Sequence, residues 1–325
     1  MKSIPHGAGP LGLCLALAAC GPEPDALRTF FADEFVEAPA RSLRFLAFRQ
    51  GSCETVNRVP FSEVGGLDLE VLADRTVPYP PASDSAPLEG LPRGSAFVLA
   101  AAALDGEGLV VGRACRGVRL GDGSQIVELN LRLHLDCPSP PTQRLVATVV
   151  EVSDAMFLGD IAVGESVASV FSSEFYRPAE QARHLLVLPD GGEVRVVGPT
   201  ADVAPIRAEL DRLSFQGLSR IHDGVVRAVR ELRDRMSCQT GPVAVLAAAG
   251  PDRGSSRFAR EAILALDGVD FVPEDDIPAV GIGLGRGGVD ALQALLVPPD
   301  PIYGGSDQDS FTFAVQQARR DALGR

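Results

Sequence analysis

The chain has 325 residues, of which 46% are hydrophobic, and it carries a formal net charge of −13 at pH 7. This length allows two domains of ordinary size, and this hydrophobic content excludes a chain that is disordered throughout. An acidic surface repels phosphate backbones, so the charge argues against a nucleic acid as the partner.

The N-terminal segment has the order of a secretory leader. Lys2 supplies a positive charge, and the apolar run Leu11–Ala19 that follows is shorter than the roughly 20 residues of a membrane-spanning helix. Residues 17–20, Leu-Ala-Ala-Cys, resemble the bacterial lipobox. The resemblance implies a signal peptide over residues 1–19 and a lipid such as palmitate on Cys20, which would anchor the protein in a membrane of the cell envelope. A plain secretory leader is the alternative. Gly21, where an inner-membrane lipoprotein would have aspartate, favours the outer membrane by the same analogy.

The cysteines after residue 20 are even in number, which favours disulfides in an exported protein. They are Cys53, Cys115, Cys137 and Cys238. No CxxC pair suggests a zinc site. Of the three possible connectivities, we expect Cys53–Cys115 within a first domain and Cys137–Cys238 at its junction with a second. Buried free thiols are the alternative.

Residues 20–41 combine prolines with acidic and small residues, and they predict a tether with one helical turn around Phe30–Phe35. Residues 42–136 alternate apolar and polar side chains, which is typical of strands with one buried face. The expected strands are Leu43–Phe48, Leu67–Leu72, Phe97–Leu104, Leu109–Ala114 and Val127–His134. Short strands at this spacing predict an all-β sandwich, and residues 91–98 are similar to immunoglobulin-like modules of bacterial lipoproteins.

Residues 137–144 contain three prolines and predict a linker. From residue 145 to 325 strands alternate with helices, which predicts a doubly wound α/β domain with a mostly parallel sheet. The expected strands are Leu145–Val152, Glu193–Val197, Pro242–Ala249 and Ile277–Leu284. The expected helices are Pro178–Leu188, Val203–Leu213, Val225–Met236, Phe258–Leu266 and Phe311–Leu323.

Four segments of the second domain follow one another in a recognisable order. Val149–Met156 stands in the place of a first strand with Asp-x-Ser-x-Ser-Met, and Gly217–Gly224 in the place of a Gly-Gly-Thr loop. Val243–Ser255 stands in the place of an apolar strand that ends in Thr-Asp-Gly, and Val280–Gly285 in the place of a late strand. In this order and spacing, the domain resembles a von Willebrand factor type A domain.

The family holds a divalent cation, usually magnesium, at the carboxyl edge of its sheet through carboxylate and hydroxyl oxygens. The resemblance places its ligand positions at Glu151, Ser153, Ala155, Ser219 and Ala249. The two alanines offer no side-chain oxygen, and Mg²⁺ gives up its hydration water reluctantly. We therefore expect a vestigial metal site and no cofactor.

Further polar residues lie close to these positions in sequence. Together with Glu151, Ser153 and Ser219, the side chains of Asp154, His222 and Asp252 predict a crevice that binds a protein. The alternative is that these residues only cap helices and close turns.

Two motifs that suggest other chemistry lack their structural context. The glycines of Gly283–Gly288 fit GxGxxG, but no second βαβ strand with an acidic residue follows. Ser219, His222 and Asp223 lie within one helical turn of sequence, and no G-x-S-x-G elbow surrounds any serine.

The sequence thus predicts a non-enzymatic envelope lipoprotein that binds an unidentified envelope or extracellular protein. A hydrolase of envelope polymers and a purely structural spacer are the alternatives.

Overall fold

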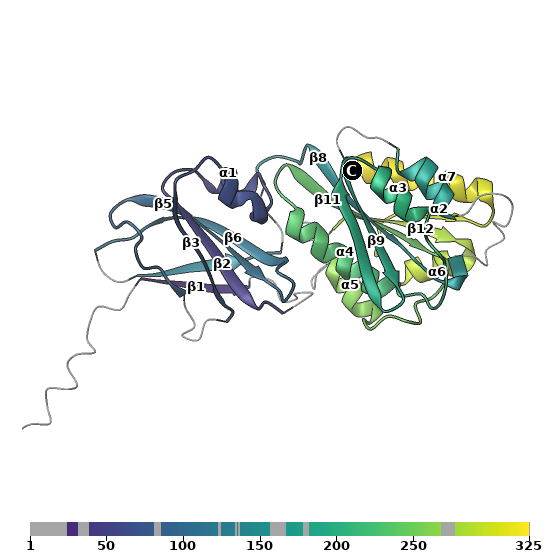
Figure 1. Cartoon of the computed structure of the whole chain (residues 1–325), viewed down its shortest axis with the longest axis horizontal. Helices are drawn as coiled ribbons and strands as arrows, with labels where there is room; N and C mark the ends of the chain where they lie inside the picture. Colours follow the sequence, from purple (N-terminus) through teal and green to yellow (C-terminus); the bar gives the residue numbers. More distant parts are fainter. Residues whose placement is uncertain are drawn as a thin grey trace, which may run out of the picture.

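A computed structural model describes residues 25–31, 39–80, 86–122, 125–133, 135, 137–156, 167–177, 182–267 and 277–324. The chain forms a β domain and an α/β domain that lie side by side (Figure 1). The predicted signal peptide and lipidation site, Cys20, lie outside the described residues.

Two sheets build the first domain. The described strands of one sheet are all antiparallel, in the order β3 (Val71–Pro78), β2 (Ser42–Phe48), β5 (Ala96–Leu104) and β6 (Val110–Arg119). Those of the other run in the order β4 (Ala86–Pro87), β1 (Ala26–Phe31) and β7 (Ile126–Leu131), with β1 and β7 parallel.

The four-stranded sheet is buried on both faces. Leu43 and Phe45 face the core between the two sheets, while Leu46 and Phe48 face a second core under helix α1 (Cys53–Asn57) and the 3₁₀ helix η1 (Phe61–Gly66). This double burial explains why β5 has an unbroken apolar run instead of alternating residues.

The structure differs from the sequence prediction at two places in this domain. Ala26–Phe31, expected within the tether of residues 20–41, is strand β1 and pairs with β7 along its whole length. Flanking prolines hid a strand whose Leu27 is fully buried. Residues 67–70 precede β3 instead of opening a strand. Two packed sheets are present, and the immunoglobulin-like character of the domain stays a prediction.

The second domain has a six-stranded sheet in the described part of the chain. Its order is β10 (Glu193–Thr200), β9 (Ala182–Asp190), β8 (Gln143–Val150), β11 (Thr240–Ala248), β12 (Ala279–Leu284) and β13 (Ile302–Gly305). Only β10 is antiparallel to its neighbour. The connections run outward in opposite directions from β8 and β11, which makes this strand pair the topological switch point.

Helices cover both faces of this sheet. On one face lie α2 (Val167–Val170), the π-helical turn η3 (Phe171–Phe175), α3 (Ala204–Leu210) and α7 (Gln308–Gly324). On the other lie α4 (Ile221–Arg235), α5 (Ala259–Asp267) and α6 (Gly285–Gln293). The α/β fold with a mostly parallel sheet is therefore confirmed, and it is consistent with a von Willebrand A-like domain.

Two sequence predictions for this domain are corrected, one about the type of an element and one about where a strand begins. The helix expected over Pro178–Leu188 is strand β9 from Ala182 onward. Apolar residues at 182, 185 and 186 fit a helical face, but Leu185 packs on one side of the sheet and Leu186 on the other, as in a strand buried on both faces. Strand β8 begins at Gln143, inside the predicted linker of residues 137–144.

The expected disulfides Cys53–Cys115 and Cys137–Cys238 are both present. The second links the segment between the domains to the residues that precede β11. Asp105, which is 4% exposed, accepts a hydrogen bond of 3.1 Å from Arg230 Nε on α4, and the Val110 N–H donates to Asp234 at 3.0 Å. The first domain therefore packs at the amino ends of the central strands, away from their carboxyl edge.

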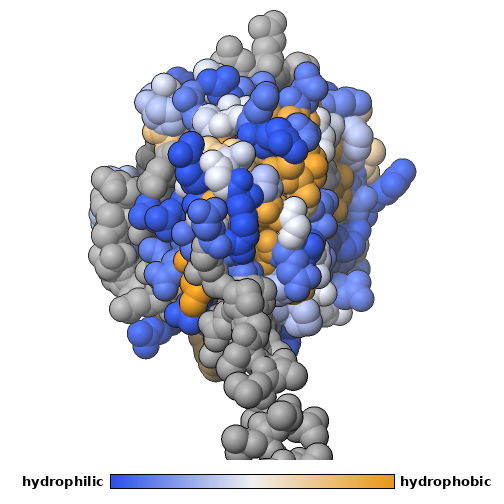
Figure 2. Space-filling view, turned by 90° about the vertical axis from the view of Figure 1, so that its left-hand side faces the viewer, coloured by the Kyte–Doolittle hydropathy of each residue, from blue (hydrophilic) through white to orange (hydrophobic). Residues whose placement is uncertain are grey.

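The end of the first domain that points away from the second is mostly hydrophilic, with an apolar patch among hydrophilic side chains (Figure 2). No helix in the described part of the chain combines the length and the hydropathy of a membrane span.

The buried imidazole of His184 on β9 predicts an acid-sensitive fold. Its ring lies 6.3 Å from the ring of Phe175 and 5.5 Å from that of Tyr176, between ring centroids. Burial, and after it the positive charge of Arg319, lowers the pKa of His184 to about 4, whereas an unfolded chain has a histidine pKa near 6.5. The neutral ring thus stabilises the fold fully above the unfolded pKa, and this stability is lost as the pH falls toward the folded pKa.

We expect wild-type protein to lose about 3 kcal/mol of unfolding free energy between pH 7 and pH 4 through this group. Urea unfolding at a series of pH values measures it, with His184→Phe as the variant that lacks the titration. Equal pH dependence in the two proteins would contradict the assignment.

Candidate functional site

Three loops meet at the carboxyl edge of the sheet, at the switch point between β8 and β11. We call them the first loop (residues 151–156), the second loop (217–220) and the third loop (249–258). The first and third loops are adjacent because they leave paired strands, in which Val150 lies opposite Ala247.

The side chain of Glu151 connects the first loop to the third. It is fully buried, and its Oε1 accepts a hydrogen bond from the Ser153 hydroxyl. Its Oε2 accepts the backbone N–H of Ala249 at 2.8 Å and that of Gly250 at 3.4 Å. Both carboxylate oxygens are therefore occupied by donors of the protein itself.

The two alanines lie in the same cluster. The Ala155 N–H donates to Ser153 Oγ at 3.2 Å, and a Cβ atom added to Gly250 would lie 3.4 Å from the Ala155 Cβ. Ala249 is held by its bond to Glu151. The structure therefore brings Glu151, Ser153, Ala155 and Ala249 together over the strand ends.

The second loop is bound to both others through its backbone. The Asp154 N–H donates to the Gly217 carbonyl at 3.1 Å, and the Gly217 N–H donates back to Asp154 Oδ1 at 3.2 Å. The Ser219 carbonyl accepts the N–H groups of Arg253 and Gly254 at 3.1 and 2.8 Å. Ser219 is 5% exposed, and its hydroxyl has no hydrogen-bond partner among the described residues. These hydrogen bonds hold the three loops in a fixed arrangement relative to one another.

Asp252 and Asp223 order the third loop around the start of α4. Asp252 Oδ2 accepts the His222 N–H at 2.8 Å and the Ser255 hydroxyl at 2.6 Å. Burial raises the pKa of the Asp223 carboxyl, but hydrogen bonds lower this pKa by more than burial raises it. The strongest of these bonds come from the backbone and side chain of Ser256, and the net pKa of Asp223 lies below its usual value. The sequence did not reveal these roles of the two serines, because only the folded loop brings them to α4.

The residues at the magnesium positions do not fit the ion. Ala155 and Ala249 present methyl groups, and the carboxylate of Glu151 is occupied by three protein donors. Mg²⁺ requires near-octahedral oxygen ligands and keeps its water where these are missing. In the described ranges, no group of three or more His, Cys, Asp or Glu side chains is arranged to hold a metal.

The hydroxyl of Ser219 is not hydrogen-bonded to the imidazole of His222. His222 Nδ1 lies 3.4 Å from Asp252 Oδ2 and 3.3 Å from the Arg257 carbonyl, whereas the Ser219 hydroxyl bonds to none of the described residues. A serine nucleophile needs hydrogen-bond contact with its base, so Ser219 and His222 do not form a catalytic pair in this structure.

Two large apolar side chains of these loops are exposed, and the sequence analysis singled out neither of them. Leu218 of the second loop is 59% exposed and Phe258 of the third is 77% exposed. A Cβ atom added to Gly254 would lie 3.0 Å from the Leu218 Cβ, so Leu218 rests on the third loop, which also carries Phe258. We call Leu218 and Phe258 the apolar rim.

No family model matches the chain, and no curated protein matches it. Among solved structures, it is similar to proximal thread matrix protein 1 of the mussel byssus, with 10% identity and a TM-score of 0.42 over 56% of this chain and 48% of that one. The chain thus spans about half the length of the mussel protein. It is also similar to the VWA domain of SpRpn10, with 14% identity and a TM-score of 0.42 over 54% of this chain and 95% of that domain. Likeness at this level carries no argument about function, and the fold assignment rests on the strand order and connections above.

Removal of the Glu151 carboxylate tests whether it holds the loops together. Glu151→Ala leaves the Ser153 hydroxyl and two backbone N–H groups without their acceptor, and each buried unsatisfied group costs about 1–3 kcal/mol. We expect a loss of about 3 kcal/mol of unfolding free energy, measured by urea denaturation. Asp154→Ala is the matched control, because Asp154 is exposed and its side chain accepts a bond from the Gly217 N–H. An equal loss in both variants would show that Glu151 has no special role.

Proposed function

We propose that this protein is an exported, lipid-anchored envelope protein whose α/β domain binds another protein at the carboxyl edge of its sheet, without a metal ion and without catalysis. The apolar rim on the bonded loops is the observation that carries this proposal. Loops that are already ordered lose little conformational entropy on binding, and large apolar side chains supply most of the energy of typical protein interfaces.

The position of the rim also supports the proposal. In open α/β sheets, ligands bind outside the carboxyl ends of the strands at the switch point, which is where the three loops lie. The first domain packs at the opposite ends of β8 and β11, so it does not cover this edge.

Export and anchoring rest on the N-terminal sequence. Residues 17–20 resemble a lipobox, and the two disulfides fit an oxidising compartment outside the cytoplasm. We take the first domain as an immunoglobulin-like spacer, on the basis of its two packed sheets, and Gly21 favours the outer membrane.

The binding test is a pull-down in which the full-length lipidated protein is recovered from its own envelope together with bound partner. We expect the double variant Leu218→Ser/Phe258→Ser to retain at least about tenfold less partner than wild type, which corresponds to about 1.4 kcal/mol. The control is Phe313→Ser, because Phe313 is 57% exposed on α7, outside the three loops. Equal capture by the double variant and the control would overturn the proposed binding edge.

In the same strain, Cys20→Ser should move the protein out of the membrane fraction, and persistence in that fraction would refute the anchor.

The proposed metal independence has a separate test. Isothermal titration of the wild type with Mg²⁺ and Mn²⁺ should give no micromolar binding, because two ligand positions lack oxygen. The double variant Ala155→Ser/Ala249→Asp restores oxygen at both positions. Its new carboxylate would lie beside Glu151, so we expect a lower melting temperature that Mg²⁺ raises again. Micromolar binding by the wild type would contradict a vestigial site.

A further inference from the structure

Strand β1 begins at the end of the first domain that lies away from the second. β1 runs parallel to β7, and the chain continues from the end of β7 to Cys137, which is bonded to Cys238 of the second domain. Both strands therefore end toward the second domain, and their starts, Ala26 and Ile126, lie opposite each other at the other end (Figure 1). We call this end, with Asp25, Ala26 and Ile126, the distal end.

The chain is attached to the distal end at Asp25. This side chain is 7% exposed, and it accepts hydrogen bonds from Arg93 Nη2 at 2.7 Å and from the Gln125 N–H at 2.9 Å. The Asp25 carbonyl accepts the Leu88 N–H at 2.8 Å, and the Ala26 N–H donates to the Gln125 carbonyl at 2.9 Å. The chain is therefore held by the folded domain from Asp25 onward.

A short link connects the distal end to the predicted lipidation site. Only four residues separate Asp25 from Cys20. A fully extended chain spans at most about 3.6 Å per residue, so Asp25 stays within about 18 Å of the cysteine in any conformation of the link. Strand β6 alone has 10 residues and a length of about 33 Å. With a lipid on Cys20, a link that is shorter than the domain holds the distal end next to the bilayer.

The distal end offers an apolar contact to this bilayer. Ile126 is 52% exposed at the start of β7, and Figure 2, which faces this end of the molecule, shows an apolar patch among hydrophilic residues. The exposed charged residues at this end include Arg93 and Arg119 as well as Glu89 and Asp122. The charge of the distal end is therefore mixed, so anionic headgroups do not meet the net negative charge of the chain there.

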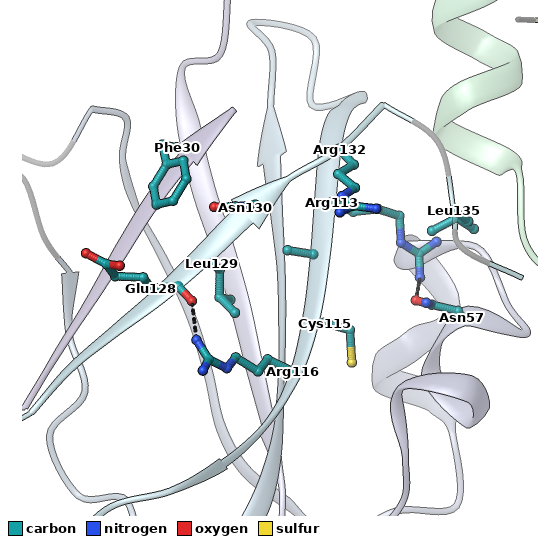
Figure 3. A pocket seen from close by; sticks show the side chains of 11 residues that line it. Phe30, Asn57, Arg113, Cys115, Arg116, Glu128, Leu129, Asn130, Arg132 and Leu135 are labelled. Carbon is teal, nitrogen blue, oxygen red and sulfur yellow. Dashed lines mark hydrogen bonds between the residues drawn. The ribbon is translucent and has the colours of Figure 1, made fainter. Parts of the chain in front are cut away.

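The flank of the same sheet is less suited to a bilayer. Phe30 is 42% exposed, but it lies further along β1 and lines a cavity of about 380 Å³ between β6 and β7 (Figure 3). The exposed ion pair of Arg28 and Glu128 lies between Ile126 and Phe30 along the two strands. Charged groups are costly to remove from water, so contact through the flank is unfavourable and contact through the distal end is not.

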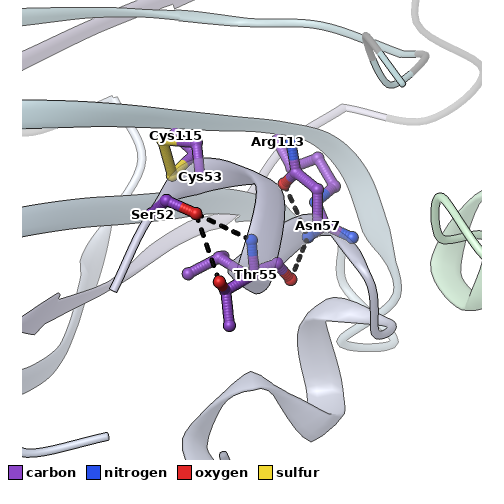
Figure 4. Close-up of a disulfide and its surroundings, with 7 residues drawn as sticks. Ser52, Cys53, Thr55, Asn57, Arg113 and Cys115 are labelled. Atoms are coloured by element: carbon purple, nitrogen blue, oxygen red, sulfur yellow. Dashed lines mark hydrogen bonds between the residues drawn. A yellow bond between two sulfur atoms is a disulfide. The ribbon is translucent and has the colours of Figure 1, made fainter. Parts of the chain in front are cut away.

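The first domain also connects the distal end firmly to the second domain. The disulfide Cys53–Cys115 ties the start of α1 to β6 (Figure 4), and the Asn57 carbonyl at the end of α1 accepts the Cys238 N–H at 2.7 Å. The first domain packs at the amino ends of the central strands, opposite the three loops. A bilayer at the distal end therefore leaves the three loops on the side away from the membrane.

We propose that the distal end is a membrane-contacting surface that rests on the phospholipid headgroups, with Ile126 at the headgroup boundary. This inference rests on the lipid anchor of the proposed function and adds which face of the protein meets the membrane. A small apolar contact is sufficient, because the short link gives the domain a high effective concentration at the bilayer. Docked in this way, the protein presents the apolar rim to a partner away from the membrane.

The test uses tryptophan as a depth probe, since the chain contains none. Full-length lipidated Ile126→Trp is reconstituted on vesicles of phosphatidylethanolamine and phosphatidylglycerol, with or without brominated acyl chains, which quench tryptophan emission at short range. We expect brominated lipid to reduce the emission at least about twofold, because a side chain at the interface lies roughly 5–10 Å into the headgroup boundary.

Phe30→Trp and Phe313→Trp are the matched controls, because both side chains are exposed, one on the flank and one on α7 of the second domain. We expect brominated lipid to change their emission little. Strong and equal quenching of Ile126→Trp and Phe30→Trp would show that the first domain lies on its flank. No quenching of Ile126→Trp that floats with the vesicles would show that the distal end does not touch them. Either result overturns the proposal and leaves the lipid anchor intact, whereas protein that does not float with the vesicles would refute the anchor and the docking with it.

Discussion

The hydrogen bonds of one buried carboxylate join the strand ends at the centre of the second domain. Glu151 follows β8, and its two oxygens bind Ser153 of its own loop and the backbone of the loop after β11. A buried carboxylate needs hydrogen-bond donors, and the N–H and hydroxyl groups of the two loops need an acceptor. The shape of the edge, and with it the exposure of Leu218 and Phe258, depends on this mutual requirement.

The sequence predicted the features that repeat along the chain. The change from alternating residues to long apolar runs located the β domain and the α/β domain, and the even cysteine count led to the disulfide pairs. It failed where a local pattern had two interpretations. Residues 182–188 fit a helical face as well as a doubly buried strand, and only the neighbouring strands decide between them. Strand β1 was also missed, because prolines flank it and its two partners, β4 and β7, lie far away in the sequence.

The candidate site could be predicted only in part for the same reason. The resemblance supplied positions for Glu151, Ser153 and the two alanines, since each lies in a loop that follows a strand. It could not supply exposure, which depends on what covers a side chain in three dimensions, so the apolar rim was missed.

The disulfide Cys137–Cys238 has a mechanical consequence. Cys238 lies two residues before β11 and Cys137 lies six residues before β8. These two central strands run parallel and end at the proposed binding edge. Tension between a partner held at that edge and the first domain would therefore enter β11 through the disulfide as well as β8 through the chain. Two parallel strands that are pulled in the same direction do not slide past each other, so the two strands share the load and their pairing stays in register.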